Sequence, residues 1–291
     1  MTASASGAAR KRRIPLAWWL LLPGALWLTL FFVVPLYSLL ATSLYDPAGG
    51  IISGYQMTWH FSNYSHAIGQ YAVPLGRSLL YGGTATLLCL LVGYPLAYAI
   101  AFKAGKWRNL MLVLVIAPFF TSFLIRTLAW KLILGDQGMV VQTMQALHLL
   151  SPGGHLLATP IAVVAGLTYN FIPFMVLPLY AALEKIDLSL IEAAQDLYAS
   201  PLRGFLKVTL PLSMPGLVAG TLLTFIPAVG DYINAQLLGN TETRMIGNVI
   251  ESLFINVGDY PAAASLSVVL MLLIVGMVLL YVRKSGTEEI L

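Results

Sequence analysis

The chain has 291 residues, of which 58% are hydrophobic and 10% are charged, and its formal net charge is +4. A soluble domain carries about 25% charged residues, so this chain has too few polar groups to cover a surface in water. Lipid can solvate the apolar excess, and the composition therefore indicates an integral membrane protein. The basic residues lie beside hydrophobic segments, so topology explains the positive charge better than binding to nucleic acid does.

Six segments are long and apolar enough to cross a bilayer as helices, which takes about 20 residues. In chain order they are residues 16–40, 77–102, 109–134, 158–183, 212–238 and 262–282. The first follows a basic stretch but is too long for a signal peptide, so we expect it to be retained. The sequence thus predicts an all-α membrane protein, with tails at 1–15 and 285–291 and one six-span transmembrane domain at 16–284.

The orientation of the spans follows from the positions of Lys and Arg, which favour the cytoplasmic side of a membrane. If both termini are cytoplasmic, the inner side holds most of the 16 basic residues: Arg10, Lys11, Arg12, Arg13, Lys103, Lys106, Arg108, Lys185, Arg203, Lys207, Arg283 and Lys284. The segment 135–157 contains none. This asymmetry predicts an even number of spans with both termini inside.

Signatures of catalysis and of metal binding are missing from the sequence. Gly105-Lys106 is followed by Trp107 and has no upstream glycine, so it is not the phosphate-binding loop of an ATPase. Cys89 is the single cysteine, and the four histidines, all in predicted outer loops, have no metal-binding spacing. We therefore expect no catalytic residue, metal site or cofactor in this chain.

The predicted cytoplasmic loop Glu184–Pro211 has the pattern of two short helices. Ser189 is placed to cap the first helix, with Glu192 completing a capping box. Ser200 is placed to cap a second helix that begins at Pro201 and ends at Pro211. The first helix would gather its apolar residues on one face: Leu190, Ala193, Ala194 and Leu197. In the second, Phe205 and Val208 would face one way, and Arg203 and Lys207 would form a basic stripe. Such a segment could lie on the inner membrane face, or dock in a groove of another protein.

This loop resembles the cytoplasmic loop of binding-protein-dependent ATP-binding-cassette import permeases. The family pattern is Glu-Ala-Ala, three residues, Gly, nine residues, Ile, one residue and Leu-Pro. The chain matches it at Glu192, Ala193, Ala194, Val208, Leu210 and Pro211. The glycine position is Tyr198, which enters a left-handed turn less readily than glycine does. Either Ala199 and Ser200 make the turn instead, or the docking surface has a different shape.

The resemblance implies a mechanism and a set of partners. The permease would lie in the lipid bilayer of a bacterial inner membrane and pair with a second, homologous permease subunit around a shared pathway. An extracytoplasmic binding protein would deliver the solute. Two ATPase subunits would bind ATP and Mg²⁺ and drive the cycle, so the chain itself would not be an enzyme. The residues implied in coupling to the ATPase are Glu192, Ala193, Ala194, Asp196, Tyr198, Leu210 and Pro211.

The similarity extends over residues 16–284 and is greatest to the first permease subunit of spermidine/putrescine transporters. It is carried by Phe225–Tyr232, Leu237–Gly239 and Ile246–Ile250. A polyamine is therefore the expected solute. A related importer of a sugar, phosphonate or metal chelate is the alternative, and a self-contained secondary transporter is a further one. The sparse carboxylates within the spans argue against the secondary transporter.

Five polar residues within or beside the fourth and fifth spans are candidates for lining the pathway: Asp231, Tyr232, Asn234, Tyr169 and Asn170. A carboxylate at the depth of Asp231 is costly unless it faces protein or water, and it could offer a counter-charge to a polyamine. The alternatives are an exposed position at a helix end, or pairing with Arg126 or Lys131. Those two basic side chains are themselves expected to snorkel outward.

Overall fold

The computed structural model describes residues 16–50, 52–151 and 153–284. The tails predicted at 1–15 and 285–291 lie outside these ranges. The described residues are almost entirely helical, and their only strand-like pairings are two isolated bridges, Tyr45 to Met57 and Gly50 to Gly54. The predicted all-α class is confirmed.

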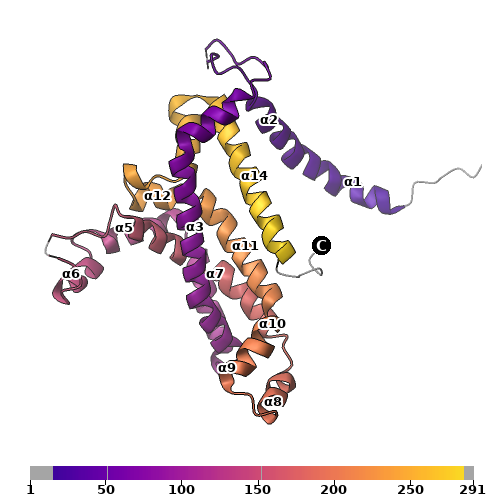
Figure 1. The fold of residues 1–291 in the computed structure, drawn as a ribbon, viewed down its shortest axis with the longest axis vertical. Helices are drawn as coiled ribbons and strands as arrows, with labels where there is room; N and C mark the ends of the chain where they lie inside the picture. Colours follow the sequence, from indigo (N-terminus) through magenta and orange to yellow (C-terminus); the bar gives the residue numbers. More distant parts are fainter. Residues whose placement is uncertain (1–15, 51, 152, 285–291) are drawn as a thin grey trace, which may run out of the picture.

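The first span is a helix with one wide turn. It consists of α1 (Leu16–Leu28), a π-helical turn (Thr29–Val33) and α2 (Val34–Thr42). Pro35 lies at the start of α2 and has no N–H to donate to the preceding turn, which explains why the helix widens there. Figure 1 shows α1 diverging from the rest of the molecule, and the apolar part of this span buries none of its residues against the chain.

Three long helices form the core. They are α3 (Ser62–Phe102), α7 (Pro160–Leu183) and α11 (Met214–Gly230), and their central side chains are buried together. Small residues allow close approach: a Cβ added to Gly220 would lie 3.0 Å from the carbonyl oxygen of Met175. Helix α3 extends the predicted second span by a kinked N-terminal part, with non-helical torsions at Tyr71.

The predicted third span, 109–134, is not one straight helix. It is divided into α4 (Arg108–Ile116), a 3-10 turn (Ala117–Phe120) and α5 (Phe123–Leu134), and α6 (Met139–Ala146) follows. The part before residue 121 and the part after residue 122 meet at 95°. Thr121 and Ser122 are extended at the break. Pro118 within the 3-10 turn explains why the α-helix does not continue.

The predicted fifth span, 212–238, is also interrupted. The helix formed by α9 (Pro201–Gly204), a π-helical turn (Phe205–Thr209) and α10 (Leu210–Leu212) bends by 67° into α11. The chain leaves helical geometry at Asp231 and resumes it in α12 (Ile233–Leu238). The remaining elements are a 3-10 turn (Thr241–Thr243), α13 (Ile246–Ser252), a π-helical turn (Leu253–Val257) and α14 (Tyr260–Lys284).

Among the described residues, four helical stretches are long and apolar enough to cross a bilayer singly, and counting each bent pair as one span gives six. This agrees with the number predicted from the sequence. The short helices α8 (Leu188–Asp196) and α9 lie at one end of the longest axis, and the loop 43–61 lies at the other (Figure 1). The loop predicted to contact another protein therefore projects from one end of the helix bundle.

Candidate functional site

The projecting loop, residues 184–211, is called the coupling segment below. Its first helix, α8, begins at Leu188, two residues earlier than a cap at Ser189 would allow. The carboxylate of Asp187 accepts a hydrogen bond from the backbone N–H of Ser189 at 2.9 Å. The predicted capping box between Ser189 and Glu192 is therefore wrong. Asp187 does the capping, because an Asp carboxylate just before the helix reaches its free N–H groups.

This hydrogen bond lowers the pKa of the Asp187 carboxyl below its ordinary value of 3.8, since an N–H donor favours the charged form. The negative charge also lies at the positive end of the helix dipole of α8. Glu192 therefore takes no part in capping α8. Its side chain is exposed and forms no hydrogen bond or ion pair with the residues that the structure describes.

Helix α8 packs on the molecule through Ile191, which contacts the main core. Most residues of the face that was predicted to be apolar are exposed rather than packed on the helix bundle. Leu190 is 48% exposed and Leu197 is 82% exposed; Ala193 and Asp196 are also exposed, and Ala194 is half-buried. The segment thus presents leucine side chains and two carboxylates to its surroundings, a combination suited to a partner protein.

The turn after α8 is made by Tyr198 itself. Its φ is +58°, in the left-handed region that favours glycine. The prediction that Ala199 and Ser200 might take over the turn is wrong. The residue at the family's glycine position thus has the backbone conformation that glycine adopts most readily, although it is a tyrosine. Tyr198 is 97% exposed, so its aromatic side chain does not pack on the rest of this chain.

The second helix begins as predicted. The hydroxyl of Ser200 accepts a hydrogen bond from the N–H of Arg203, and Pro201 occupies the first turn. Pro211 does not end this helix, contrary to the prediction, because the helix continues to Leu212. Pro211 lies at the start of α10, where its missing N–H is tolerated after the π-helical turn. The predicted basic stripe is present, since Arg203 and Lys207 are both exposed.

The far end of the coupling segment is anchored to α3. The Phe205 ring packs edge-on against Tyr94, with ring centroids 5.4 Å apart, and also contacts Tyr98 at 6.3 Å. The hydroxyl oxygens of Tyr94 and Ser213 are 2.7 Å apart and hydrogen-bonded. Leu210 is packed against the same core. Movement of the segment would therefore be transmitted to α3 and to the 67° bend before α11.

The near end is anchored to α4. The guanidinium of Arg108 forms an ion pair with the carboxylate of Glu184. It also donates a hydrogen bond from Nε to the hydroxyl of Tyr180 at 2.6 Å and lies 5.1 Å from the centre of that ring. The two anchors hold the ends of the coupling segment and leave its middle, around Tyr198, without side-chain support from the bundle.

The candidate pathway residues fall into one polar network and two separate positions. The side-chain amide of Asn170 on α7 donates to Thr127 Oγ1 on α5 at 3.2 Å and to Asn234 Oδ1 on α12 at 3.1 Å. Asp231 accepts from the N–H of Asn234 at 2.8 Å. All four side chains are buried. The network joins three helices at the break in the fifth span.

Asp231 is 9% exposed and has no ion pair among the described residues, so the exposed position and the pairing with Arg126 or Lys131 are both wrong. Tyr232 is 41% exposed, and its backbone oxygen accepts from Asn248. Tyr169 packs against Trp130 with ring centroids 5.4 Å apart. The structure therefore brings Asp231, Asn234 and Asn170 together and leaves the two tyrosines outside the network.

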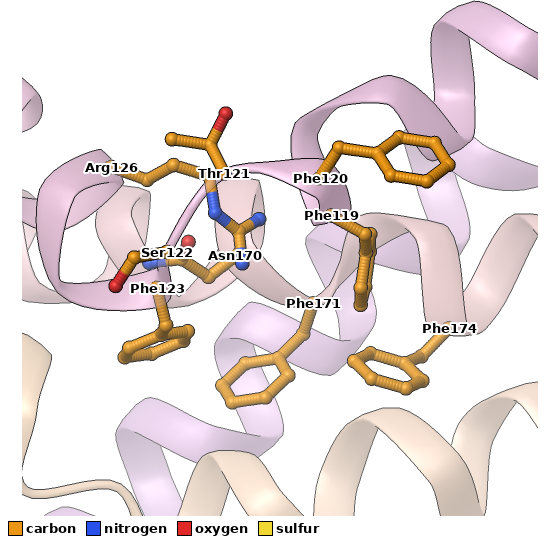
Figure 2. Close-up of a pocket in the computed structure, with 9 residues that line it drawn as sticks. All are labelled: Phe119, Phe120, Thr121, Ser122, Phe123, Arg126, Asn170, Phe171 and Phe174. Carbon is orange, nitrogen blue, oxygen red and sulfur yellow. The ribbon is translucent and has the colours of Figure 1, made fainter.

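A pocket of about 460 Å³ lies where the third span is broken. Figure 2 shows its lining: Phe119, Phe120, Thr121, Ser122, Phe123, Arg126, Asn170, Phe171 and Phe174. Arg126 is 8% exposed, so the expectation that it snorkels outward is wrong. The sequence reasoning missed this site, although an arginine within an apolar stretch, eight residues after a proline, was a usable signal.

The fold is shared with solved import systems. A bacterial ABC transporter involved in the import of the acidic polysaccharide alginate aligns with a TM-score of 0.69 at 19% identity, covering 94% of this chain and 96% of that one. Its complex with an alginate pentasaccharide-bound periplasmic protein gives 0.74 at 18% identity, covering 93% and 94%. The MetNI methionine transporter in inward-facing form gives 0.51 at 21% identity, covering 72% and 90%.

The all-helical domain of straight and bent spans therefore has the fold of these ATP-binding-cassette import systems. The family model described as "binding-protein-dependent transport system inner membrane component" matches residues 89–284, and the chain belongs to that family. It is accordingly a multi-pass inner-membrane transport subunit and not an enzyme.

Curated relatives narrow the subgroup. The spermidine/putrescine transport system permease protein PotB of Haemophilus influenzae is 39% identical over 260 residues, covering 89% of this chain and 90% of that protein. PotB of Escherichia coli K12 is 38% identical over 262 residues, covering 89% and 94%. The inner membrane ABC transporter permease protein YdcU of the same strain is 32% identical over 227 residues, covering 74% and 72%. The chain is thus homologous to PotB nearly end to end.

Proposed function

We propose that this permease imports polyamines, spermidine or putrescine, as one half of a pathway that it shares with a second permease subunit. The observation that carries the proposal is the identity of 38–39% to PotB over 89% of the chain. Both termini and the coupling segment would lie in the cytoplasm, as the distribution of Lys and Arg predicts. The outer loops would receive the solute from an extracytoplasmic binding protein.

The coupling segment would dock on a separate ATPase. Its exposed carboxylates, leucines and Tyr198 offer charge and apolar area, and its two anchored ends support transmission of force into the bundle. ATP and Mg²⁺ would be bound by two copies of that ATPase. ATP shifts the transporter between two states because it binds one of them better, and the bends at Ser213 and at residues 121–122 are the points at which the spans could change angle.

Asp231 supports a polyamine pathway, since its carboxylate would neutralise one ammonium group of the solute. It is a buried carboxylate with no basic partner among the described residues, beside the amides of Asn234 and Asn170. An ammonium group would supply the missing charge. The single chain would contribute this one counter-charge, and the second permease would contribute the rest of the pathway.

The experiment is uptake of radiolabelled spermidine by the whole transporter, assembled with its own binding protein, second permease and ATPase in proteoliposomes. We expect ATP-dependent uptake that excess unlabelled putrescine reduces and that excess maltose or phosphonate does not. Uptake of a sugar in preference to both polyamines would contradict the proposed cargo. Spermidine uptake by this chain alone, driven by an ion gradient, would contradict the ATP-driven class.

A further inference from the structure

The pocket at the broken third span holds a positive charge with no counter-charge within ion-pair distance among the residues that the structure describes. Arg126 projects into the pocket from α5 (Figure 2). Its Nε and Nη1 atoms are buried and have no hydrogen-bond partner in the described part of the chain. The guanidinium carbon lies 5.2 Å from the Phe119 ring centre and 5.7 Å from that of Phe123, so aromatic faces supply its nearest electrostatic support. A buried cation in this state is strongly unfavourable unless a further group pairs with it.

The backbone adds to the same positive field. Helix α5 has 12 residues and begins at Phe123, on the wall of the pocket. Ser122 precedes it in an extended conformation and provides no side-chain cap. The first N–H groups of a helix have no partner within the helix, and its N-terminus carries a partial positive charge. The N-terminus of α5 and the Arg126 guanidinium therefore lie at the same cavity, and both groups favour an anion.

The depth of the pocket excludes a lipid headgroup as the anion. Asn170, Phe171 and Phe174 lie in the middle of α7, which runs from Pro160 to Leu183. A helix of this length spans the hydrocarbon layer, so its middle lies far from the headgroups. The solute is excluded as well if it is a polyamine, because a polycation would be repelled by Arg126. This second step rests on the proposed function.

The surface around the pocket is apolar and exposed. The lining residue Phe120 is 87% exposed, and the adjacent α5 residues Leu124 and Ile125, which do not line the pocket, are 48% and 58% exposed. An apolar rim around a buried, unpaired cation is the complement of a protein surface that carries one carboxylate among apolar residues. The guanidinium is suited to a bidentate contact with a carboxylate.

We propose that Arg126 and the N-terminus of α5 bind an Asp or Glu side chain of the second permease subunit, which inserts into this pocket. The contact joins the two permeases at mid-membrane depth and neutralises Arg126 beside the pathway. The contact lies at the 95° break of the third span, so it also fixes the position of that break relative to the second permease. Removal of the charge at residue 126 therefore weakens association of the two permeases.

The test uses the complete transporter with an affinity tag on this chain. In Arg126→Met, the second permease retained after detergent extraction should fall about tenfold or more, because its carboxylate loses its partner. Arg126→Lys should retain most of it. Lys131→Met, a matched loss of charge at an exposed position of α5, should change nothing. Equal retention in Arg126→Met and Lys131→Met would overturn the proposal.

Neutralisation of the partner's carboxylates identifies the contact. Each Asp or Glu in the spans of the second permease is changed to Asn or Gln, with and without Arg126→Met. For one of these carboxylates, the double variant should retain more of the second permease than the two single losses combined would predict. If no carboxylate couples, the pocket does not receive a side chain of that subunit.

A second measurement leaves Arg126 intact and so does not depend on the folding of Arg126→Met. A benzophenone amino acid in place of Phe120 should crosslink, on illumination, to a segment of the second permease that contains an Asp or Glu. Crosslinks to lipid alone would contradict the proposal. The crosslink does not require polyamine transport, so failure of spermidine uptake with a positive crosslink would reject the cargo and keep the contact.

Discussion

Tyr94 and Ser213 are joined by a hydrogen bond of 2.7 Å between their hydroxyl oxygens, which links α3 to the bend between the coupling segment and α11. Ser213 also donates to the carbonyl oxygen of Leu210 at 3.0 Å. The pair therefore ties α3 to the chain just after the end of the coupling segment.

The first prediction concerns this pair. Tyr94→Phe should reduce the free energy of unfolding by about 1 kcal/mol, the typical net contribution of one hydrogen bond. Thermal unfolding of the purified transporter measures this. Tyr98→Phe is the matched control, because Tyr98 contacts the same Phe205 ring but its hydroxyl makes no hydrogen bond among the described residues. Equal losses in the two variants would show that the hydrogen bond to Ser213 contributes nothing.

The second prediction separates backbone strain from the ring at Tyr198. Tyr198→Gly should stabilise the turn by about 1 kcal/mol, because glycine adopts the left-handed conformation without steric cost. Tyr198→Ala removes the ring but keeps the strain, so it should not stabilise. Hydrogen exchange at the Ala199 amide, which donates to the Ala194 carbonyl oxygen at 3.1 Å, reports the difference. Faster exchange in the glycine variant than in the alanine variant would contradict the strain.

The third prediction concerns pH. The pKa of Asp187 is lower in the folded protein than its ordinary 3.8, so its cap stabilises α8 at pH values above 3.8 and is lost as the pH falls below that value. Protection of the Ser189 amide from hydrogen exchange should therefore decrease on acidification, after correction for the intrinsic exchange rate. In Asp187→Asn, which keeps an oxygen acceptor without the titration, protection should be flat across this range. A matching decrease in Asp187→Asn would assign the effect to another group.

The fourth prediction concerns the buried amide network. Asn170→Leu removes the donors to Thr127 and Asn234 and leaves the Asn234 amide group buried without them. The expected loss of stability is about 1–3 kcal/mol. Thr168→Val on the same helix is the control, since the Thr168 hydroxyl bonds only to the carbonyl oxygen of Val164 one turn away. Similar losses in both variants would mean that the bonds between helices add nothing.

Much of the fold could be predicted from the sequence, because hydropathy and length report the transfer of apolar segments into lipid. The breaks in the spans at residues 121–122 and 231–232 could not, since a hydropathy window registers composition and not backbone geometry. Pro118 was a signal for the first of these breaks. The burial of Arg126 was missed for a related reason. The expectation of snorkelling assumes that an arginine in a span faces lipid, whereas the break in the third span directs the Arg126 side chain into a pocket.

The coupling segment was also predicted only in part. The sequence pattern predicted its position and its two helices, but it did not decide which residue caps the first helix. Asp187 and Ser189 are both capping residues two positions apart, and the observed start of α8 at Leu188 selects the first. At Tyr198, the pattern located the turn correctly, while side-chain preference pointed to its neighbours. Tyr198 adopts the left-handed conformation that the turn requires, although a tyrosine disfavours it.

The central claim is that the coupling segment transmits ATPase action to the permease, and Glu192→Lys tests it most directly. The side chain is exposed and has no partner among the described residues, so stability should change by less than about 0.5 kcal/mol. Glu242→Lys, the same change of charge at an exposed position outside the coupling segment, is the control.

The decisive measurement is ATP-dependent spermidine uptake together with the amount of ATPase that co-purifies with each variant. Both should fall about tenfold in Glu192→Lys, because a charge that faces the ATPase is reversed. The amount of co-purifying ATPase should stay at the wild-type level in Glu242→Lys, because that residue lies outside the coupling segment. Wild-type uptake and wild-type ATPase binding in Glu192→Lys would contradict the proposed role of the coupling segment.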